Sequence, residues 1–291
     1  MRHEEDSLTI VSYNLLHFGR QDEPRHTEQV ELLQAIDADV LAVQEFWDSS
    51  PGHWSLRPRF ERFAHAVGRS GRVAQARRTH FHLGLLWRDG IGLRGWHAYE
   101  DGFWHGLGVA ELDVRGVTVR VGVGHLNPFD PEYRLAEARL VAGLGLADAT
   151  RATILAADWN TIGEDLAYDP EPDWSALAPD RLPRHLRWQD DPTAPPSADR
   201  RASALLSRAG LHDAARAIGA SWQPTSGLED APRRIDAFRV SAPVLPALAG
   251  YEVIDTAVTR RLSDHLPIVL RLDLDRLRAA TERAHRRDDG A

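Results

Sequence analysis

The sequence predicts a fold in which β-strands and α-helices are mixed throughout the chain, and three observations support this class. First, 291 residues are enough to bury a large hydrophobic core. Second, 43% hydrophobic and 27% charged residues is the composition of a globular protein rather than a disordered one. Third, apolar runs of strand length alternate with segments whose apolar residues recur at helical spacing.

The N-terminal half of the chain is predicted to contain five strands and two helices. Apolar residues at helical spacing predict the helices, one over residues 24–36 and one around residues 60–67. The last two strands are separated only by Arg115-Gly116, which indicates a hairpin. The five strands span residues 8–13, 39–44, 83–87, 107–113 and 117–124.

The C-terminal half is predicted to begin with a helix over residues 131–146, because Pro131 suits a first helical turn. Strands are expected at 153–157, 234–240 and 267–272. Residues 161–199 are rich in proline and aspartate and too long for a plain connector, so we expect an elaborated surface loop. Neither an internal repeat nor a flexible linker interrupts the chain. The sequence therefore predicts one domain over residues 1–278, followed by a polar tail at 279–291 that frays after a short helix.

Composition excludes several classes of function. The chain has no cysteine, which excludes disulfides, thiolate catalysis and cysteine-ligated metal sites. The first twenty residues lack the features of a signal peptide, and no apolar run approaches the roughly 20 residues of a membrane span. We therefore expect a soluble cytoplasmic protein without membrane insertion, and nothing in the sequence indicates a protein partner.

The charge balance constrains how the protein can bind phosphate. Asp and Glu outnumber the basic residues by 43 to 35, which gives a net charge of −8 and excludes a generally basic surface for nucleic acid. All the basic residues are arginine. Any cationic side chain that contacts phosphate must therefore be a guanidinium.

Polar residues occur where the apolar strands end. Mixed sheets gather such strand ends along one edge, so we expect these side chains to lie together. Carboxylates and amides are ligands for a hard divalent cation, and histidines serve in proton transfer. The six clusters are Asn14, Gln44-Glu45, His125, Asp158-Trp159-Asn160, Arg234-Ile235-Asp236 and Ser263-Asp264-His265.

The ordered series of these motifs, ending in Ser263-Asp264-His265-Leu266-Pro267, resembles the endonuclease/exonuclease/phosphatase superfamily, whose fold is that of deoxyribonuclease I. The resemblance extends from about residue 8 to residue 272. It implies an α+β fold, a four-layer α/β/β/α sandwich of two packed mixed sheets, with the site at one edge. It also implies divalent-metal-dependent cleavage of phosphoesters.

Two departures from the family pattern affect the expected shape of the pocket. Members often carry Gly-Asp-Phe-Asn where this chain has Ala157-Asp158-Trp159-Asn160. They commonly have an aromatic residue after Arg-Ile-Asp, whereas Ala237 follows here. Neither change removes a polar side chain, so the expected reaction class is unaffected.

The resemblance and the chemistry of the side chains together suggest the metal ligands. Glu45 is expected to bind Mg²⁺ directly, because Mg²⁺ is usually held by one or two carboxylates together with water and substrate phosphate. Asn14 and Asp264 would complete the shell, partly through water. Mn²⁺ is expected to substitute for Mg²⁺.

The remaining candidates are assigned to catalysis and substrate binding. Asp158 would orient or deprotonate the attacking water, while Asn160, two residues further on, donates to a phosphoryl oxygen. His265 would contact the phosphate or transfer a proton, with Asp236 fixing its tautomer. His125 would protonate the leaving group or bind phosphate, and Asn127 would bind substrate.

Structural alternatives to three of these roles stay open at this level. Asn14 can be a turn residue, and His125 can be a hydrogen-bonded core histidine. Asp236 can form a surface ion pair with Arg234.

The substrate is suggested by a basic stretch between Trp54 and Trp96, where arginines exceed acidic residues by about seven. Residues 68–79 within it predict a mobile basic loop, and Arg77 and Arg78 are the candidate polyanion contacts. Against this, Phe60 and Phe63 can simply be the buried face of a helix, and the acidic segment 161–199 would repel a nucleic acid if it bordered the cleft.

A nuclease or general phosphodiesterase acting on DNA or RNA is the leading interpretation. One alternative is a phosphatase or phosphodiesterase for a small phosphorylated metabolite or a lipid head group. Another is a non-catalytic phosphate-binding module, which the retention of Glu45, Asp158 and His265 disfavours.

Overall fold

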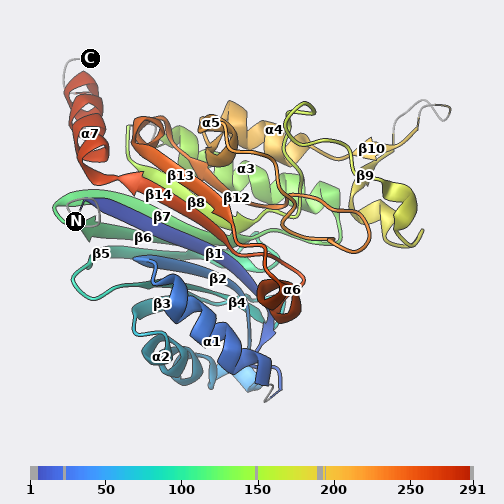
Figure 1. The fold of residues 1–291 in the computed structure, drawn as a ribbon, viewed down its shortest axis with the longest axis horizontal. Coiled ribbons are helices and arrows are strands. Elements are labelled where there is room, and N and C mark those ends of the chain that lie inside the picture. The colour runs from blue at the N-terminus through green and yellow to red at the C-terminus, as the bar shows by residue number, and fades with distance from the viewer. Residues whose placement is uncertain (1–5, 22–23, 148–149, 189–192, 194, 289–291) are drawn as a thin grey trace.

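Two six-stranded sheets pack face to face with helices on both outer faces in the computed structural model, which describes residues 6–21, 24–147, 150–188, 193 and 195–288 (Figure 1). This is the four-layer α/β/β/α sandwich that the sequence resemblance implies. The outermost residues of the expected domain and tail, 1–5 and 289–291, lie outside the described ranges.

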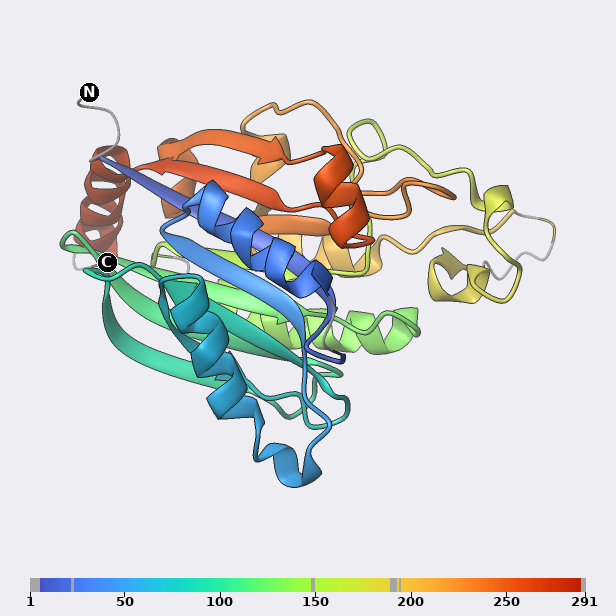
Figure 2. The same ribbon diagram turned by 60° about the horizontal axis from the view of Figure 1, so that its bottom comes forward.

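The first sheet, sheet A, carries α1 (Pro24–Ile36) and α2 (Leu56–Ala66) on its outer face (Figure 2). Phe60 and Phe63 of α2 pack against this face, so they belong to the core as the structural alternative held. Only β1 and β2 are parallel, and all other pairs are antiparallel. In spatial order the strands are β13 (Leu248–Val253), β14 (Ile268–Asp273), β1 (Ser7–Phe18), β2 (Val40–Trp47), β4 (Phe81–Trp87) and β3 (Ser70–Ala74).

The second sheet, sheet B, is covered by α3 (Pro131–Ala147) and α4 (Arg201–Arg208). Its β7 and β8 are parallel neighbours, and its other pairs are antiparallel. In spatial order the strands are β11 (His212–Asp213), β12 (Asp236–Val240), β8 (Thr153–Asp158), β7 (Val117–His125), β6 (Gly106–Val114) and β5 (Gly92–Tyr99).

Both faces of the central strands are apolar because both are buried. In β8, Ile154 and Ala156 lie in the core between the sheets, whereas Leu155 and Ala157 pack under α3 and α4. A strand of this kind has no polar face along its length, so after Thr153 at its start the next polar side chain, Asp158, comes where the strand leaves the core.

Short elements lie between the strands and helices of the main layers, and α6 precedes the motif that contains His265. These short elements are η1 (Pro51–His53), η2 (Trp174–Ala176), η3 (Leu182–Arg184), β9 (Leu186–Arg187), β10 (Ser197–Ala198), α5 (Ala214–Ala217), η4 (Ala242–Ala247) and α6 (Ala257–Leu262). The last helix, α7 (Leu274–Asp288), stands at the end of the molecule opposite the segment 161–199 (Figure 1).

Two local expectations are wrong. Residues 68–79 are not a mobile loop, because β3 occupies 70–74 and pairs with β4 along five registered positions from Ser70↔Trp87 to Ala74↔Leu83. The tail does not fray after residue 278, since α7 continues to Asp288. The elaborated segment 161–199 contains only short 3-10 turns and two-residue strands in its described part, consistent with a surface loop.

Within the described ranges, every helix falls short of the length or the apolar character that a bilayer crossing requires.

Candidate active site

The predicted polar residues meet at one edge of the sandwich, where the two sheets come together. In sheet B, His125 is in register with Asp158, which is in turn in register with Asp236. In sheet A, Asn14 on β1 lies opposite Gln44, next to Glu45 on β2. Because β1 and β2 run parallel, as do β7 and β8, their carboxyl ends bring these groups to a common edge.

Asn14 connects the two sheets through its side-chain amide. Its Nδ2 donates to Glu45 Oε1 and to Asp158 Oδ2, each at 3.1 Å. Its Oδ1 accepts from the backbone N–H of Leu16 at 3.0 Å, so it also forms the local turn that the structural alternative described. The carboxylate expected to hold the metal and the carboxylate expected to act on water are therefore bridged by one buried amide.

The backbone leaves regular strand geometry at the site. Glu45 has a φ of 62°, and the pairing of β2 with β4 is irregular between Val43 and Phe46. Asn160 also lies in the left-handed region, with a φ of 51°. Asparagine adopts this conformation readily, whereas for glutamate it is strained and is characteristic of functional sites.

His265 and Asp236 form a buried pair. His265 Nδ1 lies 2.8 Å from Asp236 Oδ2. An ionised carboxylate can only accept, so Nδ1 carries the proton and Nε2, 3.7 Å from Asp158 Oδ2, faces the cleft. Burial lowers the pKa of His265, but the carboxylates of Asp236 and Asp158 outweigh it and hold this pKa well above its usual value.

Arg234 is not the surface partner of Asp236. Its guanidinium is buried between Asp169 and Asp213, with contacts of 2.5 Å and 2.7 Å to their carboxylates. The two charged residues of the Arg-Ile-Asp motif therefore have different roles. Arg234 belongs to a buried ion-pair cluster, whereas Asp236 binds His265.

His125 is a buried neutral imidazole. Its Nε2 lies 3.3 Å from Asp158 Oδ2, and its ring stacks on that of His105 with 4.1 Å between centroids. Burial lowers the pKa of His125 to about 3, and the positive charge of His265 adds to this. A neutral His125 that donates from Nε2 suits holding Asp158 or a phosphate oxygen better than protonating a leaving group.

The other predicted contacts divide into those at the cleft and those away from it. Asp264 is exposed and lines the cleft, as does Arg78. Arg77 instead pairs with Glu100 and Asp101, at 2.8 Å and 3.0 Å, and is absent from the cleft lining. The buried Asn127 accepts from the backbone N–H groups of Phe129 and Asp130, which makes it a turn residue ahead of α3.

The donor set fits a divalent cation. Burial raises the pKa of Glu45 to about 7, with Asp264 and Asp158 adding to the rise. Burial also raises the pKa values of Asp158 and Asp236. A site where carboxylates crowd around one protonated histidine has negative charge that a hard divalent ion offsets with oxygen ligands. Ligand atoms of Asp158, Asp236 and His265 also lie within 4.8 Å of one another, but Asp236 is occupied by His265, and Asp158 accepts from Asn160 and Asn14. Glu45 and Asp264 therefore suit a metal ion better than this group does.

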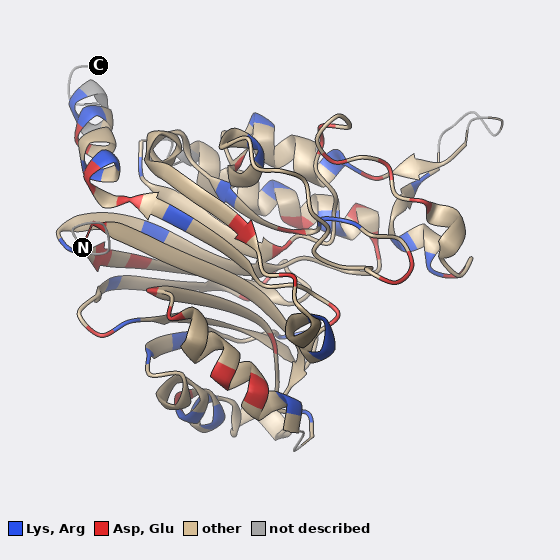
Figure 3. Cartoon of the chain, viewed as in Figure 1, with Lys and Arg blue, Asp and Glu red and all other residues tan. Residues whose placement is uncertain are grey.

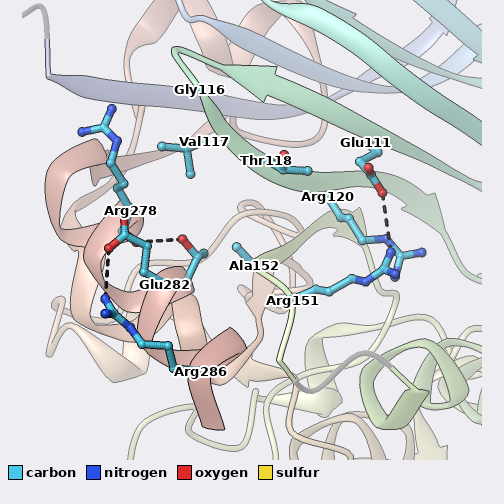
Figure 4. Close-up of a pocket in the computed structure, with 11 residues that line it drawn as sticks. Glu111, Gly116, Val117, Thr118, Arg120, Arg151, Ala152, Arg278, Glu282 and Arg286 are labelled. Atoms are coloured by element: carbon cyan, nitrogen blue, oxygen red, sulfur yellow. Dashed lines mark hydrogen bonds and ion pairs between the residues drawn. The ribbon is translucent and has the colours of Figure 1, made fainter. Parts of the chain in front are cut away.

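A cleft of about 640 Å³ opens over this cluster. Its floor contains Glu45, Asp158 and His265, and its walls contain aromatic and arginine side chains from both sheets. A larger hollow of about 800 Å³ lies at the other end of β7 and β8 (Figure 4). Arginines and glutamates that pair with each other line that hollow, as in Arg151–Glu111 and Arg286–Glu282, and no residue of the acid and histidine cluster reaches it.

Two buried charged residues on α3, Arg134 and Glu137, bind segments that border the cleft. The sequence predicts that they lie on a helix but gives no signal of this role. Arg134 donates to the backbone carbonyls of Asn160 and Arg184. Glu137 accepts from the backbone N–H groups of Trp104 and Asn127 at 2.6 Å and 2.7 Å. These hydrogen bonds connect α3 to four segments that border the cleft.

The charge balance of the basic stretch, residues 54–96, and of the acidic segment, residues 161–199, does not predict which charged side chains each presents to the cleft. Most arginines of residues 54–96 pair with acidic side chains, in the ion pairs Arg57–Glu61, Arg59–Asp48, Arg69–Asp37, Arg77–Glu100, Arg88–Asp39 and Arg94–Asp113. Conversely, the segment 161–199 presents Arg181, Arg184 and His185 to the cleft. Several carboxylates in its described part pair with arginines away from the cleft, for example Glu171 with Arg200. Figure 3 shows the two signs interspersed along the chain. The repulsion expected if acidic residues of this segment bordered the cleft is not supported, because the charged side chains that the segment contributes to the cleft lining are arginines.

Comparisons with known proteins agree with this geometry. The model of the endonuclease/exonuclease/phosphatase family matches residues 11–265. No match to the sequence is found among the curated proteins.

Three solved structures illustrate the shared fold. An endonuclease/exonuclease/phosphatase family protein from Bacteroides thetaiotaomicron is 16% identical, with a TM-score of 0.61 over 91% of this chain and 97% of its own. One from Beutenbergia cavernae is 22% identical, with a TM-score of 0.62 over 92% and 72%. TDP2 from D. rerio, solved with a single-strand DNA product, is 15% identical, with a TM-score of 0.60 over 91% and 98%.

Proposed function

Because the chain belongs to the endonuclease/exonuclease/phosphatase family, whose members are hydrolases of phosphoester bonds, we propose that its cleft hydrolyses phosphodiesters with the help of a divalent metal ion. The observation that supports this most strongly is the bridge of Asn14 between Glu45 and Asp158. It holds a metal-binding carboxylate and a water-activating carboxylate side by side. The leading substrate is a nucleic acid.

Asp158 is the proposed base. Its Oδ1 accepts from the backbone N–H of Asn160 at 3.0 Å, and its Oδ2 accepts from Asn14 Nδ2 at 3.1 Å. These two donors fix the orientation of the carboxylate. The Nε2 atoms of His125 and His265 lie 3.3 Å and 3.7 Å from the same Oδ2. Burial raises the pKa of Asp158, which makes it a better acceptor of a proton from the attacking water than an exposed aspartate.

The phosphoryl group would be held by three side chains around Asp158. His265, kept protonated by Asp236, presents Nε2 to the cleft. Asn160 Nδ2 donates one hydrogen bond to the carbonyl of Leu126, and its second hydrogen is available for a phosphoryl oxygen. His125 donates from Nε2. Positive and neutral donors fixed before the reaction stabilise charge that develops on the phosphate oxygens.

Glu45 and Asp264 would hold the metal ion. Asn14, the third ligand expected from the sequence, already uses its side-chain amide in hydrogen bonds with Glu45, Asp158 and Leu16 and would orient Glu45 instead. Bound by Glu45 and Asp264, Mg²⁺ supplies Lewis-acid polarisation of the phosphate and offsets charge on the leaving oxygen. The His17 backbone N–H, 3.1 Å from Glu45 Oε2, orients the glutamate toward this position.

A cleavage screen tests the proposal. Candidate substrates are plasmid DNA, an abasic duplex, RNA, single-stranded DNA and a chromogenic phosphodiester, with a phosphomonoester to represent small phosphorylated metabolites. Single-stranded DNA belongs in the screen because the D. rerio neighbour was solved with such a product.

We expect hydrolysis of at least one diester in Mg²⁺ or Mn²⁺ and none in excess chelator, because the proposed ligands are hard oxygen donors. Turnover that persists in chelator would remove the metal assignment. Hydrolysis of the monoester alone would favour a phosphatase.

A further inference from the structure

Three arginines at the cleft lie over aromatic rings. The guanidinium carbon of Arg20 is 5.2 Å from the ring centroid of Trp47, that of Arg78 is 5.8 Å from Tyr133, and that of Arg184 is 5.2 Å from Phe129. All three arginines line the cleft.

These arginines differ from most others in the chain. None of the three has a carboxylate partner among the residues that the structure describes, although acidic residues outnumber arginines by 43 to 35. Arg77, the neighbour of Arg78, shows the contrast because it binds both Glu100 and Asp101. The cleft arginines therefore keep a positive charge that no described side chain neutralises.

Stacking on an aromatic ring orients these guanidinium groups so that they can bind phosphate. A guanidinium over an aromatic face is held in one plane, while its N–H edge stays available for bidentate contact with phosphate oxygens. The three pairs thus provide oriented anion contacts at the walls of the cleft.

The pairs lie on both sides of the acid cluster. Arg20 follows β1 and Trp47 is the last residue of β2, so both belong to the end of sheet A. Arg184 and Phe129 belong to the segments that border sheet B. The Asn14 bridge between Glu45 and Asp158 joins the two sheets between them.

The aromatic rings on the sheet B side form a surface on which bases can stack. Trp104 meets Phe129 and Tyr133 edge-on, with centroids 6.3 Å and 6.0 Å apart. Phe129 is 52% exposed. Bases of a duplex have their faces covered by their neighbours, whereas those of an unpaired strand can stack on protein rings.

We propose that Arg20–Trp47, Arg78–Tyr133 and Arg184–Phe129 bind an unpaired polynucleotide strand on both sides of the phosphate to be cleaved. This inference rests on the proposed function for the position of the scissile phosphate. It assigns the substrate class as a flexible strand with phosphates on either side of the reacting one, rather than a small phosphoester.

The test is a binding measurement that needs no turnover. A fluorescein-labelled single strand of about a dozen nucleotides, close to the site sizes of strand-binding grooves, is titrated with the protein in chelator, and anisotropy is followed. Wild type is compared with Arg20→Gln, Arg78→Gln, Arg184→Gln and the matched control Arg77→Gln. Thermal unfolding checks that all variants are folded.

We expect each cleft variant to weaken strand binding by roughly 5- to 10-fold and to reduce the salt slope of binding by about 0.7, because one phosphate contact is lost. Arg77→Gln should bind within about twofold of wild type, since exposed ion pairs of this kind contribute little. The unlabelled strand should compete better than its duplex or a dinucleotide.

Equal effects of Arg77→Gln and Arg78→Gln would overturn the inference, as would a duplex or dinucleotide that competes as well as the strand. Diester hydrolysis without preferential strand binding would leave the proposed function in place and remove this inference. Preferential strand binding by a protein that hydrolyses no diester would leave this inference in place and remove the proposed function.

Discussion

Replacing Asp158 with asparagine is expected to lower kcat by about 10²- to 10⁴-fold, the usual contribution of a general base. Asparagine keeps the size of the side chain and its contact with the Asn160 N–H, but it cannot take a proton from water. Substrate affinity should stay similar or tighten, because a negative group facing an anionic phosphate is removed. Single-turnover rates and substrate dissociation constants, measured together, separate the two effects.

A matched control is Asp130→Asn, which changes an exposed aspartate that caps the start of α3 and does not line the cleft. Near-normal turnover in Asp158→Asn would show that the proposed base is wrong. A metal requirement that rises more in Asp158→Asn than in Glu45→Gln would also contradict the assignment, since Glu45 is the proposed direct ligand and Asp158 acts mainly on water.

Replacing Arg234 with methionine is expected to lower the free energy of unfolding by about 3–5 kcal/mol, because removal of one partner leaves buried charges without compensation. The variant would leave the carboxylates of Asp169 and Asp213 buried and uncompensated by Arg234. Urea denaturation followed by circular dichroism measures the change.

Arg94→Met provides the comparison, because Arg94 is half exposed in its ion pair with Asp113. Its loss should change the free energy of unfolding by no more than about 1 kcal/mol. If Arg234→Met were as mild as Arg94→Met, the ion-pair cluster around Arg234 would not contribute to stability as described.

The central strands were predictable from sequence because both of their faces are buried. In the strand Thr153–Asp158, the four residues between the first threonine and the terminal carboxylate are all apolar. The strands of the two six-stranded sheets that the periodicity does not reveal, β3, β5, β11 and β13, are the four edge strands of these sheets. Edge strands are partly exposed and tolerate glycine and charge, as in the Gly92–Tyr99 strand, so their apolar pattern is weak.

The partners of charged side chains could not be read from the sequence. Arg77 and Arg78 are adjacent and chemically identical, yet one binds two acidic residues on the β5–β6 connection and the other stacks on Tyr133 at the cleft. Local charge counts therefore overstate the basic character of residues 54–96 and the acidic character of residues 161–199. The left-handed backbone at Glu45, which turns its carboxylate toward Asn14, likewise depends on the packing of β1, β2 and β4.

The most direct test of the metal-dependent phosphodiesterase assignment is the Mg²⁺ dependence of diester hydrolysis by wild type and Glu45→Gln. We expect no turnover in chelator and full recovery on addition of Mg²⁺. We also expect Glu45→Gln to need at least about tenfold more Mg²⁺ for half-maximal rate, because a direct carboxylate ligand is lost. Full turnover by wild type in excess chelator, or an unchanged Mg²⁺ requirement in Glu45→Gln, would show that the metal assignment is wrong.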